Sequence, residues 1–234
     1  MTVTKKTSAL LFLMLSVPVC VAADIKGIVL WYMEQEAGNE PYKVRYIVTS
    51  DFMRSDEGET EEGFVLFDRK QRQIFSVVPE NETILHVNGK GEAPDSAKQL
   101  KVEIRESIDD KAPRVAGKSP VTLELVADGE SCYSAIVVPG FLEQARLAFL
   151  EFNQALAVQQ VRTLGNTPQE YQTPCFLSRY VYTSDFYLQR GLPLWDWGRS
   201  GERRELISYE TDVELDEQLF QLPQGLATIR AAGN

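Results

Sequence analysis

Three short apolar runs separated by polar connections form the clearest pattern in the chain, between residues 63 and 87. They cover residues 64–67, 74–78 and 83–87, and runs of this length bounded by turn-forming residues predict an antiparallel β-meander. The first two runs place apolar side chains on both faces, whereas a half-exposed strand alternates apolar and polar residues. We therefore expect other parts of the chain to cover this sheet on both sides.

Similar patterns predict further strands before and after the meander. Residues 25–35 form a long run with an apolar middle, and residues 42–49 return as an amphipathic strand. Asp128 and Gly129 are the turn pair expected within a later hairpin. The other predicted strands are residues 51–54 as a short extension, 100–104, 121–126 and 132–138, which gives about eight strands before the first helix.

A long amphipathic helix is predicted over residues 141–161. Its apolar positions recur at intervals of three or four residues, which is the spacing of a core-facing stripe. We expect this helix to cover one face of the meander, and its phenylalanines to be core residues rather than a ligand box. The stripe consists of Phe141, Ala145, Phe149, Phe152 and Leu156.

Two helix-start signals follow. Thr167 with Pro168 and Glu170 matches a capping box, and Thr173 with Pro174 predicts the start of a short helix. The remaining predicted elements are that short helix over residues 175–182, a closing hairpin of residues 193–197 and 204–210, and an extended segment over residues 219–223.

These elements predict one domain over residues 24–234, because no repeat or linker divides the chain. The expected fold class is α+β, with a curved antiparallel sheet or incomplete β-barrel covered by helices. The predicted helices form an excursion at about residues 140–190.

The first 23 residues have the layout of a secretory signal peptide. Lys5 and Lys6 precede an apolar core over residues 9–19, and small residues end at Ala23. The apolar core is shorter than the roughly 20 residues of a membrane span, so we expect a soluble exported protein, in the periplasm of a bacterium. Lipid attachment at Cys20 is the alternative, but the residues before Cys20 lack the small side chains such a site prefers.

The chain is acidic, with 24 basic and 34 acidic residues and a formal net charge of −10. Cleavage of the leader removes two lysines and no acid, which makes the charge −12. Binding to nucleic acid or to anionic lipid headgroups requires clustered positive charge. The composition therefore argues against both kinds of partner.

Cys132 and Cys175 are the two cysteines outside the leader. An even pair in an exported protein predicts a disulfide, and closing this loop stabilises the fold by up to about 4 kcal/mol. A redox pair or a metal site is the alternative, but the chain has no C-x-x-C motif and a single histidine, His86. We expect no metal and no cofactor.

No catalytic set emerges from the sequence. His86 lies within a predicted strand, no phosphate-binding loop is present, and no pair of carboxylates is singled out by its spacing. The acidic segment over residues 55–62 lacks the alternate oxygen ligands of a calcium loop. We therefore predict that the protein is not an enzyme.

Aromatic residues near Pro193 form the most distinctive candidate for ligand contact, namely Tyr187, Trp195 and Trp197. Packing in the core or in the closing hairpin is the alternative interpretation. For a ligand held by the curved sheet, the predicted contact residues are Trp31, Tyr46, Phe64, Leu66, Trp195 and Trp197.

The segments SDFMRSDEG, GFVLFDRKQRQIFSVVPENETILHV and ETDVELDEQLFQLPQGL, together with the leader, resemble the periplasmic lipoprotein-carrier superfamily and its uncharacterised proteobacterial relatives. The resemblance covers residues 25–87 and 193–226, and the helices tied by cysteine depart from the pattern of the carriers. It implies an incomplete antiparallel barrel wrapped over helices, with an apolar cavity for acyl chains.

Two functions are therefore expected. The first is a non-enzymatic periplasmic protein that binds an apolar ligand or a lipidated partner in a half-barrel. The alternative is an envelope scaffold or assembly factor that binds another protein through a strand edge or through the helical excursion.

Overall fold

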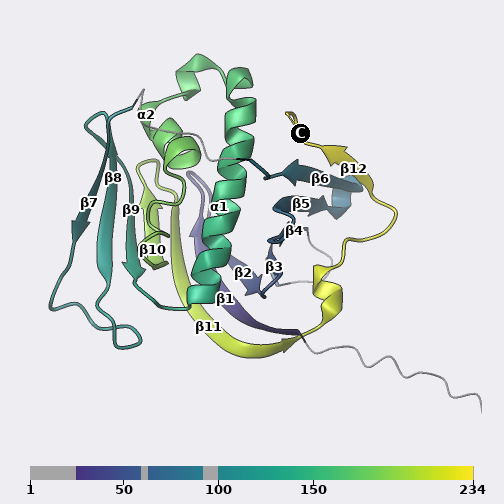
Figure 1. Ribbon diagram of the computed structural model, residues 1–234, viewed down its shortest axis with the longest axis horizontal. Helices are drawn as coiled ribbons and strands as arrows, with labels where there is room; N and C mark the ends of the chain where they lie inside the picture. Colours follow the sequence, from purple (N-terminus) through teal and green to yellow (C-terminus); the bar gives the residue numbers. More distant parts are fainter. Residues whose placement is uncertain (1–24, 59–62, 92–99, 234) are drawn as a thin grey trace, which may run out of the picture.

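A computed structural model describes residues 25–58, 63–91 and 100–233. The predicted leader over residues 1–23 lies outside these residues, as does part of the acidic segment. One large sheet curves around a long central helix (Figure 1). Within the described residues, no helix combines the length and apolar composition that a membrane span requires.

The sheet has twelve strands in the described part of the chain, in the order β12-β6-β5-β4-β3-β2-β1-β11-β10-β9-β8-β7. Neighbouring strands are antiparallel except β12 and β6, which are parallel. The sheet does not close, so β12 and β7 are its edges. The strands are β1 (Ile25–Gln35), β2 (Tyr42–Val48), β3 (Phe52–Asp56), β4 (Phe64–Asp68), β5 (Gln73–Val78), β6 (Thr83–Asn88), β7 (Val102–Ser107), β8 (Val121–Ala127), β9 (Glu130–Val138), β10 (Leu192–Gly198), β11 (Arg203–Leu215) and β12 (Ala227–Arg230).

The helical elements over residues 143–182 form one layer on the concave face of this sheet (Figure 1). The fold is therefore mostly sheet, and the expected α+β class holds with a smaller share of helix than the sequence pattern suggested. The helical elements are η1 (Pro79–Asn81), α1 (Glu143–Thr163), η2 (Leu164–Asn166), η3 (Gln169–Tyr171), α2 (Pro174–Phe176), η4 (Leu177–Tyr182, a π-helical turn) and η5 (Glu217–Phe220).

The concave face of the sheet packs against α1, which confirms the predicted cover of the meander. Leu30 and Phe67 are fully buried there, and the ring of Phe67 lies 5.6 Å from that of Phe152 on the helix. Phe149 on the same helix is also buried. Most of the core is therefore formed between one helix and the inner residues of many strands.

The convex face of the meander has a second, smaller core. Ile47, Leu66 and Phe220 form its buried centre, and the ring of Phe220 stacks on Phe52 at 5.5 Å. The extended segment predicted over residues 219–223 was wrong at its start, because η5 turns Phe220 back onto the sheet. Asp216 caps this turn by accepting a hydrogen bond from the backbone N–H of Gln218 at 2.9 Å. Each face of the meander thus has a core packed against part of it, which explains its two-sided apolar pattern.

The two predicted helix starts had different outcomes. The start at Thr173 is confirmed, because its hydroxyl accepts a hydrogen bond from the N–H of Phe176 at 3.2 Å. The capping box at Thr167 was wrong, because Pro168 is extended and η3 begins without a side-chain cap. Strand β12 was not predicted at all, since its four residues are all exposed and four residues are too few for their alternation to indicate a strand.

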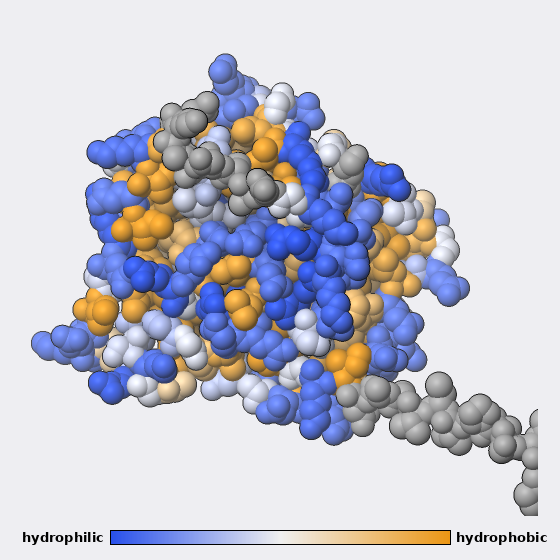
Figure 2. All heavy atoms as spheres, in the orientation of Figure 1, coloured by the Kyte–Doolittle hydropathy of each residue, from blue (hydrophilic) through white to orange (hydrophobic). Residues whose placement is uncertain are grey.

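Hydrophilic residues predominate on the face of the molecule that carries α1, with hydrophobic residues in smaller patches between them (Figure 2). The buried apolar side chains therefore lie between α1 and the sheet, and not on the outer face of α1.

Gly89, just after β6, is where α1 closely approaches the meander. A Cβ atom on Gly89 would lie 2.4 Å from the Cβ of Ala155. We expect Gly89→Ala to lower the free energy of unfolding by about 1–3 kcal/mol, because the helix must move away. Gly165→Ala is the matched control, since its new methyl group would meet nothing within 4 Å. Urea unfolding followed by circular dichroism measures both, and equal stability of the two variants would contradict this packing.

Candidate functional site

A cleft of about 340 Å³ opens between the helical layer and the ends of β1, β10 and β11. Its wall carries Tyr42, Tyr133, Tyr180 and Tyr187, and we call it the tyrosine cleft. Three positively charged residues, Arg179, Arg203 and Arg204, also line it. The cleft thus combines aromatic faces with charged hydrogen-bond donors.

The floor of the tyrosine cleft is an ion pair between Asp196 of β10 and Arg204 of β11. The Nε and Nη2 groups of Arg204 donate to Oδ2 of Asp196 at 3.0 and 2.9 Å. Asp196 is 1% exposed, and the hydroxyl of Tyr133 donates to its other carboxylate oxygen. The hydroxyl of Tyr187 accepts hydrogen bonds from Arg204 at 3.4 Å and from Asn153 at 3.2 Å. This network fixes the position of the guanidinium group.

The pKa values at the floor follow from burial and from the ion pair. Burial raises the pKa of Tyr133, and the negative charge of Asp196 raises it further. Burial also raises the pKa of Tyr187. For Arg204, burial acts to lower the pKa, but Asp196 and the neighbouring tyrosines outweigh it and hold the pKa well above the usual value. The floor is therefore a charged pair surrounded by neutral phenols at physiological pH.

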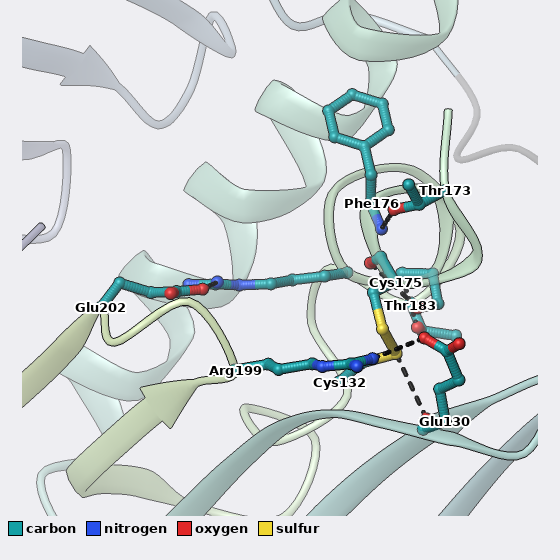
Figure 3. Close-up of a disulfide and its surroundings, with 10 residues drawn as sticks. Glu130, Cys132, Thr173, Cys175, Phe176, Thr183, Arg199 and Glu202 are labelled. Carbon is teal, nitrogen blue, oxygen red and sulfur yellow. Dashed lines mark hydrogen bonds and ion pairs between the residues drawn. A yellow bond between two sulfur atoms is a disulfide. The ribbon is translucent and has the colours of Figure 1, made fainter. Parts of the chain in front are cut away.

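A disulfide fixes the helical side of the tyrosine cleft, as the sequence predicted (Figure 3). It joins Cys132 of β9 to Cys175 of α2. The adjoining η4 carries Arg179, whose guanidinium carbon lies 3.7 Å from the ring centre of Tyr133 and which forms an ion pair with Glu202. The disulfide therefore helps to hold a cation over the aromatic wall.

A second depression, of about 350 Å³, lies on the strands of the meander and of β2, and we call it the meander hollow. Tyr46, Phe64 and Val65 contribute to its wall. Glu34 and Tyr42 line both the meander hollow and the tyrosine cleft, so the two spaces adjoin. The hydroxyl of Tyr46 donates to a carboxylate oxygen of Glu34 at 2.7 Å.

The six predicted ligand-contact residues do not form one site. Tyr46 and Phe64 both line the meander hollow. Trp195 and Trp197 lie side by side with ring centres 4.9 Å apart, and Trp197 borders a shallow recess beside the disulfide. Leu66 is 3% exposed in the convex core, which makes it a packing residue rather than part of either space.

The alternation of side chains between the two faces of a strand explains where Trp31 and Asp196 lie. Trp31 follows the buried Leu30 of the concave face and therefore points to the convex face, where Arg45 lies 5.7 Å from its ring. Asp196 lies between the two tryptophans and points into the cleft for the same reason. The sequence reasoning missed Asp196 and Arg204, although a charged residue between apolar neighbours in a predicted strand was a usable signal.

Histidine and metal-ligating side chains are not gathered at the tyrosine cleft. The described residues contain no group of three or more His, Cys, Asp or Glu side chains placed to hold a metal. His86 is not part of the cleft, and its ring stacks on Phe75 at 4.9 Å. Burial lowers the pKa of His86, and the charge of Arg230 lowers it further.

We expect Asp196→Asn to lower the free energy of unfolding by about 3–5 kcal/mol, because Arg204 would remain buried without a counter-charge. Glu130→Gln is the matched control, since it removes an ion pair with Arg199 in which both side chains are more than half exposed. That exposed pair should contribute at most about 1 kcal/mol. Urea unfolding of both variants measures the difference, and a similar loss in each would show that the floor is not the stronger pair.

No family model matches the chain, and no curated protein matches it. Among solved structures, the chain is similar to PNGF-II in two space groups, with 13% and 12% sequence identity and TM-scores of 0.41 and 0.40. These matches cover 88% of this chain but only 31% and 32% of PNGF-II. It is also similar to an uncharacterized conserved protein from Thermus thermophilus, with 8% identity, a TM-score of 0.44, and coverage of 88% of this chain and 91% of that one.

Proposed function

We propose that this protein is a non-enzymatic periplasmic binding protein that holds an amphipathic ligand on the concave face of its sheet. The observation that carries the proposal is the pair of adjoining spaces that share Glu34 and Tyr42. Each space is close to the lower end of the range of about 300–1,000 Å³ that small-molecule pockets occupy. Together they offer an apolar wall next to a polar one.

The apolar part of the ligand fits the meander hollow, which is lined by Val44, Val65, Val77, Tyr46 and Phe64. An acyl chain of a lipid or of a lipidated partner has the same chemistry, and the resemblance to lipoprotein carriers supports that source. The rest of the concave face is filled by α1, so the apolar part must be short or must extend out of the meander hollow.

The polar part fits the tyrosine cleft. Its buried charges at Asp196 and Arg204 already satisfy each other, so the floor offers fixed donors rather than a free base or nucleophile. This arrangement supports binding rather than catalysis. The disulfide between Cys132 and Cys175 supports a location outside the cytosol, where such bonds persist.

Filling the meander hollow should abolish binding. Ser76 is half-buried in its wall, so we expect Ser76→Phe to weaken binding of the neutral fluorescent probe N-phenyl-1-naphthylamine by at least about tenfold. Ser208→Phe is the matched control, because Ser208 is exposed and lines neither space. Native mass spectrometry of protein purified from its own envelope complements the titration. Wild-type protein that binds no probe and carries no co-purified ligand would refute the proposal.

A protein partner is the alternative function, and the exposed apolar residues Trp195 and Ile207 favour it. We expect a photo-crosslinking amino acid at Trp195 to capture one defined envelope protein if the protein is a scaffold. The same amino acid at the exposed Glu217 is the control position. Equal and diffuse labelling from both positions would exclude a partner at the tryptophans.

A further inference from the structure

The junction of the two spaces carries carboxylates that form no direct ion pair with a described residue. Glu34 accepts a hydrogen bond from the neutral hydroxyl of Tyr46, and Glu36 accepts one from Tyr42 at 3.5 Å and one from Asn39 at 3.1 Å. Neither carboxylate forms an ion pair with a residue that the structure describes. Glu34 interacts electrostatically with Arg204 without a direct bond, and the direct hydrogen bonds to both carboxylates come from neutral groups.

Two of the three arginines that line the tyrosine cleft already form ion pairs with other carboxylates. Glu34 lies opposite Arg204 in the register of β1 and β11, but Arg204 donates to Asp196 and Tyr187. Arg179 forms its ion pair with Glu202. The third guanidinium of the tyrosine cleft belongs to Arg203, which is exposed at the rim.

The lining of the meander hollow also has more acidic than basic residues. Its described lining includes Glu34, Asp56 and Glu57 but no lysine or arginine. Asp56 is neutralised from the convex side, because Arg45 and Arg54 donate to it at 2.8 and 2.6 Å. Glu57 forms no ion pair with a described residue. Two carboxylates, Glu34 and Glu57, thus line this space without an ion-pair partner among the described residues.

The pKa values of the neighbouring phenols are raised mainly by burial and in part by these carboxylates. Burial raises the pKa of Tyr42 to about 12, and the charges of Glu34 and Glu36 contribute to this increase. Burial also raises the pKa of Tyr46, with Glu34 as the next largest cause. Both rings therefore stay neutral and present electron-rich faces, which attract cations.

We infer that the head group of the proposed amphipathic ligand is a cation, such as a primary ammonium group, and that it binds at Glu34 and Tyr42, where the two spaces meet. This inference rests on the proposed binding function. An ammonium group would supply the missing counter-charge and donate hydrogen bonds to Glu34, while its apolar chain lies along Val44 and Val65 in the meander hollow. A carboxylate or phosphate head would instead meet Glu34, Glu36 and Glu57 with like charge.

The test uses three molecules with the same apolar chain, octylamine, octan-1-ol and octanoate, titrated into the protein by isothermal calorimetry at pH 7 and low salt. Octylamine is charged at this pH, because an alkylammonium group titrates near pH 10. We expect octylamine to bind about tenfold more tightly than octan-1-ol, and octanoate to bind more weakly than either. The preference should shrink in 0.5 M sodium chloride, because salt screens charge pairs that water can reach.

Variants locate the head group. Glu34→Gln keeps an acceptor for the hydroxyl of Tyr46 but removes the negative charge. A double variant that carries both Glu34→Gln and Glu57→Gln should therefore bind octylamine with only the affinity that it has for octan-1-ol. Glu217→Gln is the control, because it removes an exposed carboxylate that lines neither space. The expected result is a loss of the preference for octylamine in the double variant and not in the control.

The other outcomes separate this inference from the proposed function. Octan-1-ol or octanoate binding as tightly as octylamine would overturn the cationic head group while leaving an apolar binding site in place. Octylamine binding that is unchanged in the double variant would overturn its location. Failure of all three molecules to bind would overturn the proposed binding function itself.

Discussion

The packing of α1 into the curve of the sheet is the contact on which the rest of the structure depends. Phe149 meets the rings of Tyr32 at 6.1 Å and Tyr46 at 4.8 Å, so one helical residue spans two adjacent strands. Arg69 lies in the turn between β4 and β5, and its guanidinium group donates two hydrogen bonds, of 2.7 and 3.1 Å, to the carboxylate of Glu151 on α1. A bidentate pair of this kind fixes orientation as well as position. Because the sheet is open, this helix gives its concave face a core.

The position of α1 also decides where the free space lies. The helix covers the part of the meander around Phe67, whereas Val65, two residues earlier on the same face, lines the open meander hollow. The tyrosine cleft lies beside the second half of the helix, where Asn153 and Leu156 form part of the wall. Both spaces are thus the parts of the concave face that the helix does not fill. A single curved layer and one helix suffice to produce them.

Local pattern predicted most of the fold, whereas the candidate site needed information that no local pattern contains. Strand β1 was predicted with its observed ends, and the pairing of Cys132 with Cys175 followed from the count of cysteines alone. The pocket residues come from distant segments, since Tyr133 and Asp196 are 63 positions apart and meet only through the order of β9, β10 and β11. That order places β11 between β1 and β10, so this late strand joins the half of the sheet that contains β1 to β6 with the half that contains β7 to β10. Period-2 alternation could indicate which face Asp196 occupies, but not which residues stand opposite.

The apolar side chains on the two faces of the meander have different surroundings, and this difference bears on function. Leu66 faces the convex side, where Phe220 and its neighbours complete a closed core. Val65 faces the concave side, where the cover is incomplete and Glu34 lies nearby without a direct ion pair to a described residue. An apolar surface that faces water forgoes the free energy of burial, and a half-buried carboxylate without an ion pair forgoes a charge-assisted hydrogen bond to a cation. A ligand with an apolar chain and a cationic head would satisfy both at once, which is why we place its two parts on either side of Glu34.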